Sequence, residues 1–75
     1  MMTFEKIQDI IAKQLNVDKS RITEDTDLAV DLKADSLEIA ELLFMLEEEM
    51  KITLDDAEAL KLKTIGDIVK LIDSK

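Results

Sequence analysis

The chain of 75 residues contains a single glycine, Gly66, and no proline. Tight β-hairpins depend on glycine and proline turn chemistry, so a chain with almost none of these residues is poorly suited to an antiparallel sheet. Its apolar residues instead recur at steps of three and four, which is the period of an amphipathic helix. We therefore expect an all-α protein. The length leaves room for one small core, so residues 1–75 are expected to form a single domain.

The two clearest helices lie in the first two thirds of the chain. Residues 3–15 carry large apolar side chains at helical spacing, and Thr3 is the predicted N-cap. A second helix is predicted to begin near Asp35 and to run over residues 35–50. Asp35 and Glu38 have the spacing of a capping box, in which each side chain bonds to the backbone N–H of the other residue.

The sequence predicts two further helix starts after residue 50. The Thr-x-x-Asp patterns at 53–56 and 64–67 predict a short third helix and a longer fourth one. The expected fold is therefore a small four-helix bundle with three longer helices and one short one. Residues 16–34 are predicted to form a long ordered loop, because their apolar residues follow no sustained helical period. A loop of this length in a compact domain is often functional. Its expected anchors are Val17, Ile22, Leu28, Val30 and Leu32.

Several residue types are absent, and each absence narrows the chemistry. The chain has no cysteine and no histidine, so it lacks a thiolate and the commonest general base and metal ligand. Ser36 has no histidine to take its proton and no Gly-x-Ser-x-Gly elbow around it, so we expect no catalytic residue and no enzyme activity. No apolar run reaches the ~20 residues of a membrane span. No secretory signal pattern opens the chain, and a soluble, cytoplasmic protein is expected.

Charge is the strongest compositional signal. The net charge is −8, and the excess lies in the middle of the chain. Residues 34–50 contain no cation, and their carboxylates are Asp35, Glu38, Glu41, Glu47, Glu48 and Glu49. A surface of one sign repels polyanions and attracts proteins with basic surfaces, so nucleic acid and anionic membranes are not expected partners. The Asp25, Asp27 and Asp31 pattern lacks the glycine and glutamate of a calcium loop, and no metal site is predicted.

The helix predicted over residues 35–50 has two apolar faces. At 100° per residue, one face has the width of an ordinary core stripe and contains Ile39, Leu42, Leu43, Leu46 and Met50. Leu37, Ala40 and Phe44 fall close to the opposite side. Carboxylates surround them: Asp35, Glu38, Glu41, Glu47 and Glu48. Such a strip on the outward face favours docking of a basic, partly apolar partner. The alternative is that Leu37 and Phe44 pack beneath the long loop.

The segment around Ser36 carries a family resemblance. Asp31-Leu32-Lys33-Ala34-Asp35-Ser36-Leu37-Glu38, followed by the Leu46-Glu47-Glu48-Glu49 run, resembles the acyl carrier proteins, in which an Asp-Ser-Leu triplet opens the second helix. The resemblance covers nearly the whole chain, including its length, the first helix and the Thr64-Ile65-Gly66-Asp67 start of the last helix. The triplet alone is a weak signal, whereas the triplet in this setting is a strong one.

The resemblance implies that Ser36 carries 4′-phosphopantetheine, attached from coenzyme A by a phosphopantetheinyl transferase. The thiol of that arm would hold growing acyl chains as thioesters and deliver them to fatty acid synthesis enzymes with basic docking surfaces. The implied partner-binding residues are Asp35, Leu37, Glu38, Glu41, Phe44, Glu47 and Glu48. A monomer is expected, with acyl chains inserting between the helices. The alternatives are a D-alanyl or polyketide carrier, or an acidic helical adaptor in which Ser36 is only a helix cap.

Two positions depart from the family pattern. The family usually has glycine where this chain has Lys33, two residues before Asp35. Glycine reaches positive φ at little cost, so Lys33 is expected either to strain the turn or to change its geometry. The proline often found before the short helix is replaced by Leu54.

Overall fold

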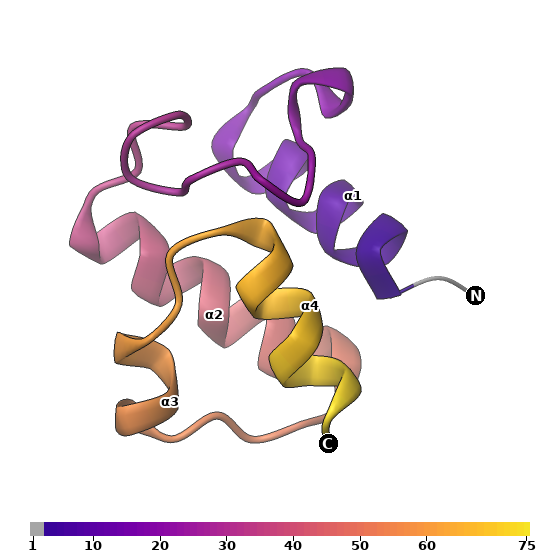
Figure 1. The fold of residues 1–75 in the computed structure, drawn as a ribbon, viewed down its shortest axis with the longest axis vertical. Helices are drawn as coiled ribbons and strands as arrows, with labels where there is room; N and C mark the ends of the chain where they lie inside the picture. Colours follow the sequence, from indigo (N-terminus) through magenta and orange to yellow (C-terminus); the bar gives the residue numbers. More distant parts are fainter. Residues whose placement is uncertain (1–2) are drawn as a thin grey trace.

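The computed structural model describes residues 3–75, and these residues form an all-α fold (Figure 1). The helices are α1 (Thr3–Leu15), α2 (Ser36–Met50), α3 (Asp56–Leu60) and α4 (Ile65–Asp73). One 3₁₀ turn, η1 (Lys19–Arg21), lies in the loop between α1 and α2. The predicted bundle of three longer helices and one short one is confirmed. Within the described range, no helix is both long and apolar enough to cross a membrane.

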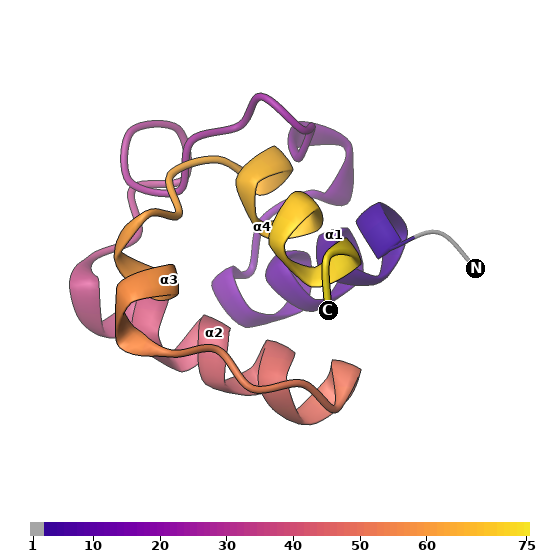
Figure 2. The same cartoon turned by 60° about the horizontal axis from the view of Figure 1, so that its bottom comes forward.

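The core is aliphatic and is built mainly by three helices. Helix α1 packs against both α2 and α4 (Figure 2). The apolar stripes predicted from the sequence point inward, and the side chains with no exposed surface are Ile7, Ile11, Leu42, Leu46, Ile65 and Ile68. Burying each such side chain contributes about 1.5–3 kcal/mol of transfer free energy. Helix α3 contributes no buried residue to this core.

Two of the predicted helix starts are confirmed in atomic detail. The Asp35 side chain accepts from Glu38 N at 2.8 Å, and Glu38 Oε1 accepts from Asp35 N at 3.0 Å, which completes the capping box of α2. Thr64 and Asp67 form the corresponding box at the start of α4. Each box pairs N–H groups that a helix otherwise leaves without an acceptor.

Two other start predictions are wrong. Helix α3 is capped by Asp55, which exchanges hydrogen bonds with Glu58, and therefore begins two residues after the start that the Thr53 pattern predicted. Thr3 already lies within α1 and is not its N-cap. The Thr3 hydroxyl donates to Asp73 Oδ1 at 2.6 Å and so joins the start of α1 to the end of α4.

The loop between α1 and α2 is ordered by both apolar and polar anchors. Ile22 and Leu28 are fully buried, as predicted, whereas Val30 is 72% exposed and the expectation that it anchors the loop is wrong. The reason is local: the Asp27 carboxylate accepts from the N–H of Val30 at 2.8 Å and fixes a turn that directs this residue outward. From α1, the Gln8 amide donates to Lys19 O and to Ile22 O.

The same loop is joined by its backbone to the start of α4. Leu28 N donates to Lys63 O at 2.9 Å, and Ile65 N donates to Thr26 O at 3.0 Å, around an isolated antiparallel bridge. Gly66 N donates to Glu24 O at 2.8 Å. A Cβ at position 66 would lie 3.0 Å from that same carbonyl oxygen, so the glycine permits the close approach of two backbones.

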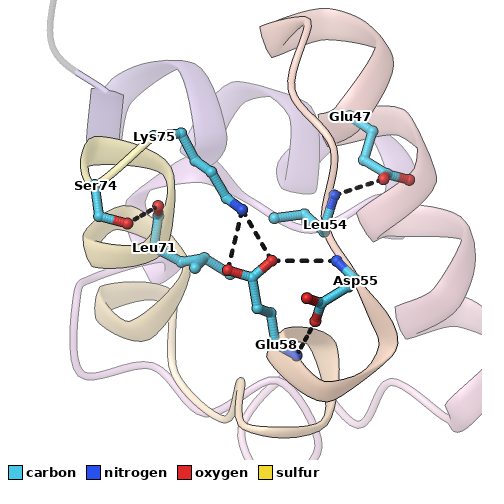
Figure 3. A network of polar contacts seen from close by, with 7 residues as sticks. All are labelled: Glu47, Leu54, Asp55, Glu58, Leu71, Ser74 and Lys75. Carbon is cyan, nitrogen blue, oxygen red and sulfur yellow. Dashed lines mark hydrogen bonds and ion pairs between the residues drawn. The ribbon is translucent and has the colours of Figure 1, made fainter.

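Polar contacts hold α3 in place (Figure 3). The Lys75 ammonium donates to both carboxylate oxygens of Glu58, at 2.9 and 3.0 Å, and thereby connects α3 to the end of α4. This contact lowers the pKa of Glu58 below its usual range. The segment leading into α3 is held by Glu47, whose Oε2 accepts from Leu54 N at 2.8 Å.

Asp67 makes part of the free energy of unfolding depend on pH. Its carboxylate accepts from the backbone N–H groups of Thr64 and Lys63, and these bonds lower its pKa from the ordinary value of 3.8. A lowered folded-state pKa contributes stability above the unfolded-state pKa, and this contribution disappears as the pH falls through the folded-state value. We expect the Asp67→Asn variant to be less stable than the wild-type chain at pH 7. The difference in the free energy of unfolding should shrink below pH 4.

Urea unfolding of both chains from pH 7 to pH 2.5 measures this difference. Comparing the two chains removes most of the common effect of acid on the net charge, which is −8 at pH 7 and becomes positive below the isoelectric point of about 4.3. A stability difference that stayed constant over this pH range would contradict the assignment to Asp67.

Candidate functional site

Ser36 is the first residue of α2, and its side chain is exposed. The N-cap is Asp35, so the hypothesis that Ser36 serves as the helix cap is wrong. Among residues 3–75, the Ser36 hydroxyl has no hydrogen-bond partner, and neither do the backbone N–H groups of Ser36 and Leu37. The start of α2 therefore presents a free hydroxyl beside two free N–H donors at the positive end of the helix dipole.

The approach to Ser36 is fixed by a short run of local contacts. Asp31 accepts from the backbone N–H of Asp27 at 2.7 Å, which closes the preceding turn. Ala34 is buried, and its N–H donates to Leu28 O at 3.0 Å. Between them Lys33 has φ of 56°, in the left-handed region that favours glycine. Of the two outcomes expected for Lys33, the angle shows that the turn keeps the left-handed geometry that glycine favours and does not adopt another.

The outward face of α2 is apolar and acidic. Leu37 is 68% exposed and Phe44 is 59% exposed, so the alternative that they pack beneath the loop is wrong. Ala40, Glu41 and Glu48 are also exposed on this helix. Large apolar side chains left this open on a small domain are typical of contact surfaces. We call Leu37, Ala40, Glu41, Phe44 and Glu48 the outer strip of α2.

The remaining predicted partner-binding residues also have structural roles. The carboxylates of Asp35 and Glu38 are exposed, but each accepts a backbone bond in the capping box. Glu47 is half-buried and accepts from Leu54 N, so its side chain is turned toward the segment before α3. No sequence pattern indicates this second role of Glu47, because it depends on where the chain returns after α2.

The acidic loop residues are also occupied by backbone contacts. Asp27 Oδ1 accepts from the N–H groups of Ala29 and Val30, and Asp31 accepts from Asp27 N. Across residues 3–75, no group of three potential ligands is arranged to hold a metal ion. These carboxylates shape the loop that leads to Ser36.

Two shallow hollows lie between helices. One, of about 310 Å³, separates α1 from the end of α2 and is lined by Lys6, Asp9, Ile10, Lys13, Met45, Glu49 and Met50. The other, also of about 310 Å³, lies between α3 and α4 and is lined by Glu58, Lys61, Leu62, Asp67, Lys70 and Leu71. Insertion of an acyl chain between the helices stays a prediction.

Comparisons with family models and with solved structures agree with each other. Residues 5–72 match the family model described as a phosphopantetheine attachment site. The fold superimposes on that of a protein from Mycobacterium tuberculosis assigned as an acyl carrier protein, with a TM-score of 0.89 and 32% sequence identity. The match covers 95% of each chain.

Proposed function

Because this chain belongs to the phosphopantetheine-attachment family of acyl carrier proteins, whose members are carriers and not enzymes, we propose that Ser36 is the residue that bears the arm. The observation that supports this most directly is the free, exposed Ser36 hydroxyl at the start of α2, where Asp35 already provides the cap. Residues 1–75 would then act as one carrier domain.

The groups around Ser36 fit a phosphodiester. The unpaired N–H groups of Ser36 and Leu37 are donors at a helix N-terminus, a position that favours phosphate oxygens. The Asp35 carboxylate opposes a second negative charge, but it is already accepting from Glu38 N at 2.8 Å. When bound, 4′-phosphopantetheine supplies the thiol that this cysteine-free chain lacks and on which acyl groups are held as thioesters.

Attachment requires little chemistry from this chain beyond the hydroxyl. The Ser36 oxygen forms a bond to the phosphorus on the pantetheine side of the coenzyme A diphosphate. The bond to the bridging oxygen breaks, and the nucleotide half leaves with that electron pair. We infer that the neighbouring carboxylate, Asp35, does not take the hydroxyl proton, because it caps α2 and already accepts from Glu38 N at 2.8 Å. A transferase therefore supplies the acid–base chemistry.

Mass spectrometry after incubation with coenzyme A and a phosphopantetheinyl transferase tests the proposal. We expect a gain of one phosphopantetheine, located by trypsin digestion. Cleavage after Lys33 and Lys51 releases residues 34–51, in which Ser36 is the only hydroxyl-bearing residue, so modification of this peptide identifies the site without ambiguity. An unmodified protein that is nevertheless folded would overturn the proposal.

We further propose that the cargo is the growing acyl chain of fatty acid synthesis. The resemblance of the Asp31–Glu38 segment and of the acidic α2 to carriers of that pathway supports this choice. The alternative carriers have the same arm, and the loading enzyme discriminates a D-alanyl carrier from a carrier of growing acyl chains. A malonyl-transferring enzyme should acylate the arm-bearing protein, whereas a D-alanine ligase should not. The opposite preference would overturn the proposed pathway.

The outer strip of α2 is proposed as the surface on which the transferase and the synthesis enzymes dock. It combines open apolar side chains, Leu37 and Phe44, with the carboxylates of Glu41 and Glu48 on the helix that begins at Ser36. Asp35, Glu38 and Glu47 would add negative charge at its margins. Basic partners would be attracted by the charge and held by the apolar contacts.

We expect Phe44→Ala to reduce kcat/KM for arm attachment about 10–100-fold, because truncating an aromatic anchor costs about 1–3 kcal/mol of binding free energy. Stability should hardly change, since Phe44 is 59% exposed. Leu60→Ala is the matched control: Leu60 is 85% exposed but lies on α3 and is not part of the outer strip. Equal kcat/KM for both variants, measured by mass spectrometry over time, would argue against docking at the outer strip.

A further inference from the structure

Lys33 is the only cation between Arg21 and Lys51, and it lies three residues before Ser36. Every other charged residue in that interval is an aspartate or a glutamate. Its backbone has φ of 56°, where glycine would be free of steric cost. The chain therefore keeps a positive side chain next to the attachment serine at a backbone position that disfavours any side chain.

The ammonium group of Lys33 has no ion-pair partner within the described part of the chain. The ion pairs there join Lys19 to Asp9 at 2.7 Å and Lys75 to Glu58 at 2.9 Å. The carboxylates nearest to Lys33 in sequence are engaged elsewhere: Asp31 accepts from Asp27 N, and Asp35 accepts from Glu38 N. The exposed Lys33 side chain is therefore available to an anion that arrives at the start of α2.

The chain holds Lys33 within reach of such an anion. Three residues span at most about 11 Å, and a lysine side chain extends its charge on a flexible four-carbon stem. Ala34, between Lys33 and the helix, is fixed by its N–H bond to Leu28 O at 3.0 Å. The cation is thus attached to the chain a few residues before the two free N–H groups of Ser36 and Leu37.

We propose that Lys33 forms an ion pair with the phosphodiester on Ser36 and so positions the base of the arm at the start of α2. This inference rests on the proposed attachment of the arm to Ser36. Lys33 acts here as a positioning residue: it takes no part in acyl transfer, and its contact is with the phosphate oxygens. The pair adds a mobile, charge-assisted donor to the backbone N–H groups of the helix terminus.

Thermal unfolding before and after loading of the arm tests the proposal. In 20 mM salt, loading should raise the Tm of the wild-type chain by roughly 2–4 °C more than that of Lys33→Gln, as expected for one exposed ion pair in a domain of this size. This excess should vanish in 0.5 M NaCl. Lys51→Gln is the matched control, because Lys51 also has φ of 56° but lies at the opposite end of α2. It should behave as the wild type does.

A second measurement needs only the wild-type protein. Nuclear Overhauser effects between the ε-methylene protons of Lys33 and the arm protons nearest the phosphate are expected in the loaded protein. Their absence, or an equal Tm gain in wild type and Lys33→Gln, would overturn this inference while leaving attachment at Ser36 intact. A wild-type chain that gains no mass would overturn both proposals.

Discussion

Ser36→Ala should abolish uptake of the arm without unfolding the protein. The oxygen that would form the phosphodiester is lost, and no neighbouring hydroxyl can replace it, since residues 34–51 contain no other serine or threonine. The fold should tolerate the change because Asp35 caps α2 and the Ser36 side chain is exposed. Alanine is also a favourable residue inside a helix, so the free energy of unfolding should change by no more than about 0.5 kcal/mol.

Intact mass and urea unfolding of the same sample check both halves of this prediction. Ser20→Ala is the matched control, because Ser20 lies in the 3₁₀ turn η1 and its hydroxyl bonds to Asp18. It should gain one arm as the wild type does. Arm uptake by Ser36→Ala would place the attachment at another residue, and loss of its fold would make Ser36 a structural residue.

Leu46→Ala should destabilise the protein by about 3 kcal/mol. Leu46 has no exposed surface, and removing a fully buried leucine side chain loses its transfer free energy and leaves a cavity. A domain of 75 residues has only about 4–11 kcal/mol of stability in total, so the loss is a large share of it. We expect a clear fall in the urea midpoint together with a population of unfolded chains that a transferase cannot modify.

The control for Leu46→Ala is available on the same helix. Leu37→Ala removes the same atoms from α2, but Leu37 is 68% exposed on the outer strip. Its stability should change by no more than about 0.5 kcal/mol. Its rate of arm attachment should fall instead. Equal loss of stability in the two variants would contradict the assignment of one face to the core and the other to partners.

The features that were predictable from sequence are those that depend on a few neighbouring residues. The Asp35–Glu38 capping box and the exposed Phe44 follow from spacing along one helix. The start of α3 could not be predicted from spacing, because Thr53 and Asp55 both begin acceptable capping patterns. The structure favours Asp55, since Glu58 reaches back to it and Glu47 holds the intervening Leu54 N–H. Such choices depend on where the chain returns in space.

The candidate site likewise has some features that could be predicted from sequence and some that could not. Ser36 and the acidic face around it were identifiable from local pattern and family resemblance. The left-handed backbone at Lys33 could not be predicted, because the sequence alone does not decide between a strained turn and another geometry. The exposure of Val30 and the second role of Glu47 depend on hydrogen bonds that no periodicity reveals.

The backbone bonds between the long loop and the start of α4 tie the serine's surroundings to the end of the chain. Thr26 and Leu28 pair with Ile65 and Lys63, which follow them by about half of the 75 residues. During synthesis Lys63 and Ile65 emerge well after the loop residues with which they pair, and contacts of long sequence separation form late in folding. A nascent chain that ends before Lys63 would contain Ser36 but not the backbone bonds that join the preceding loop to α4. If Ser36 bears the arm, a transferase that recognises the folded start of α2 would therefore modify finished domains in preference to unfinished chains.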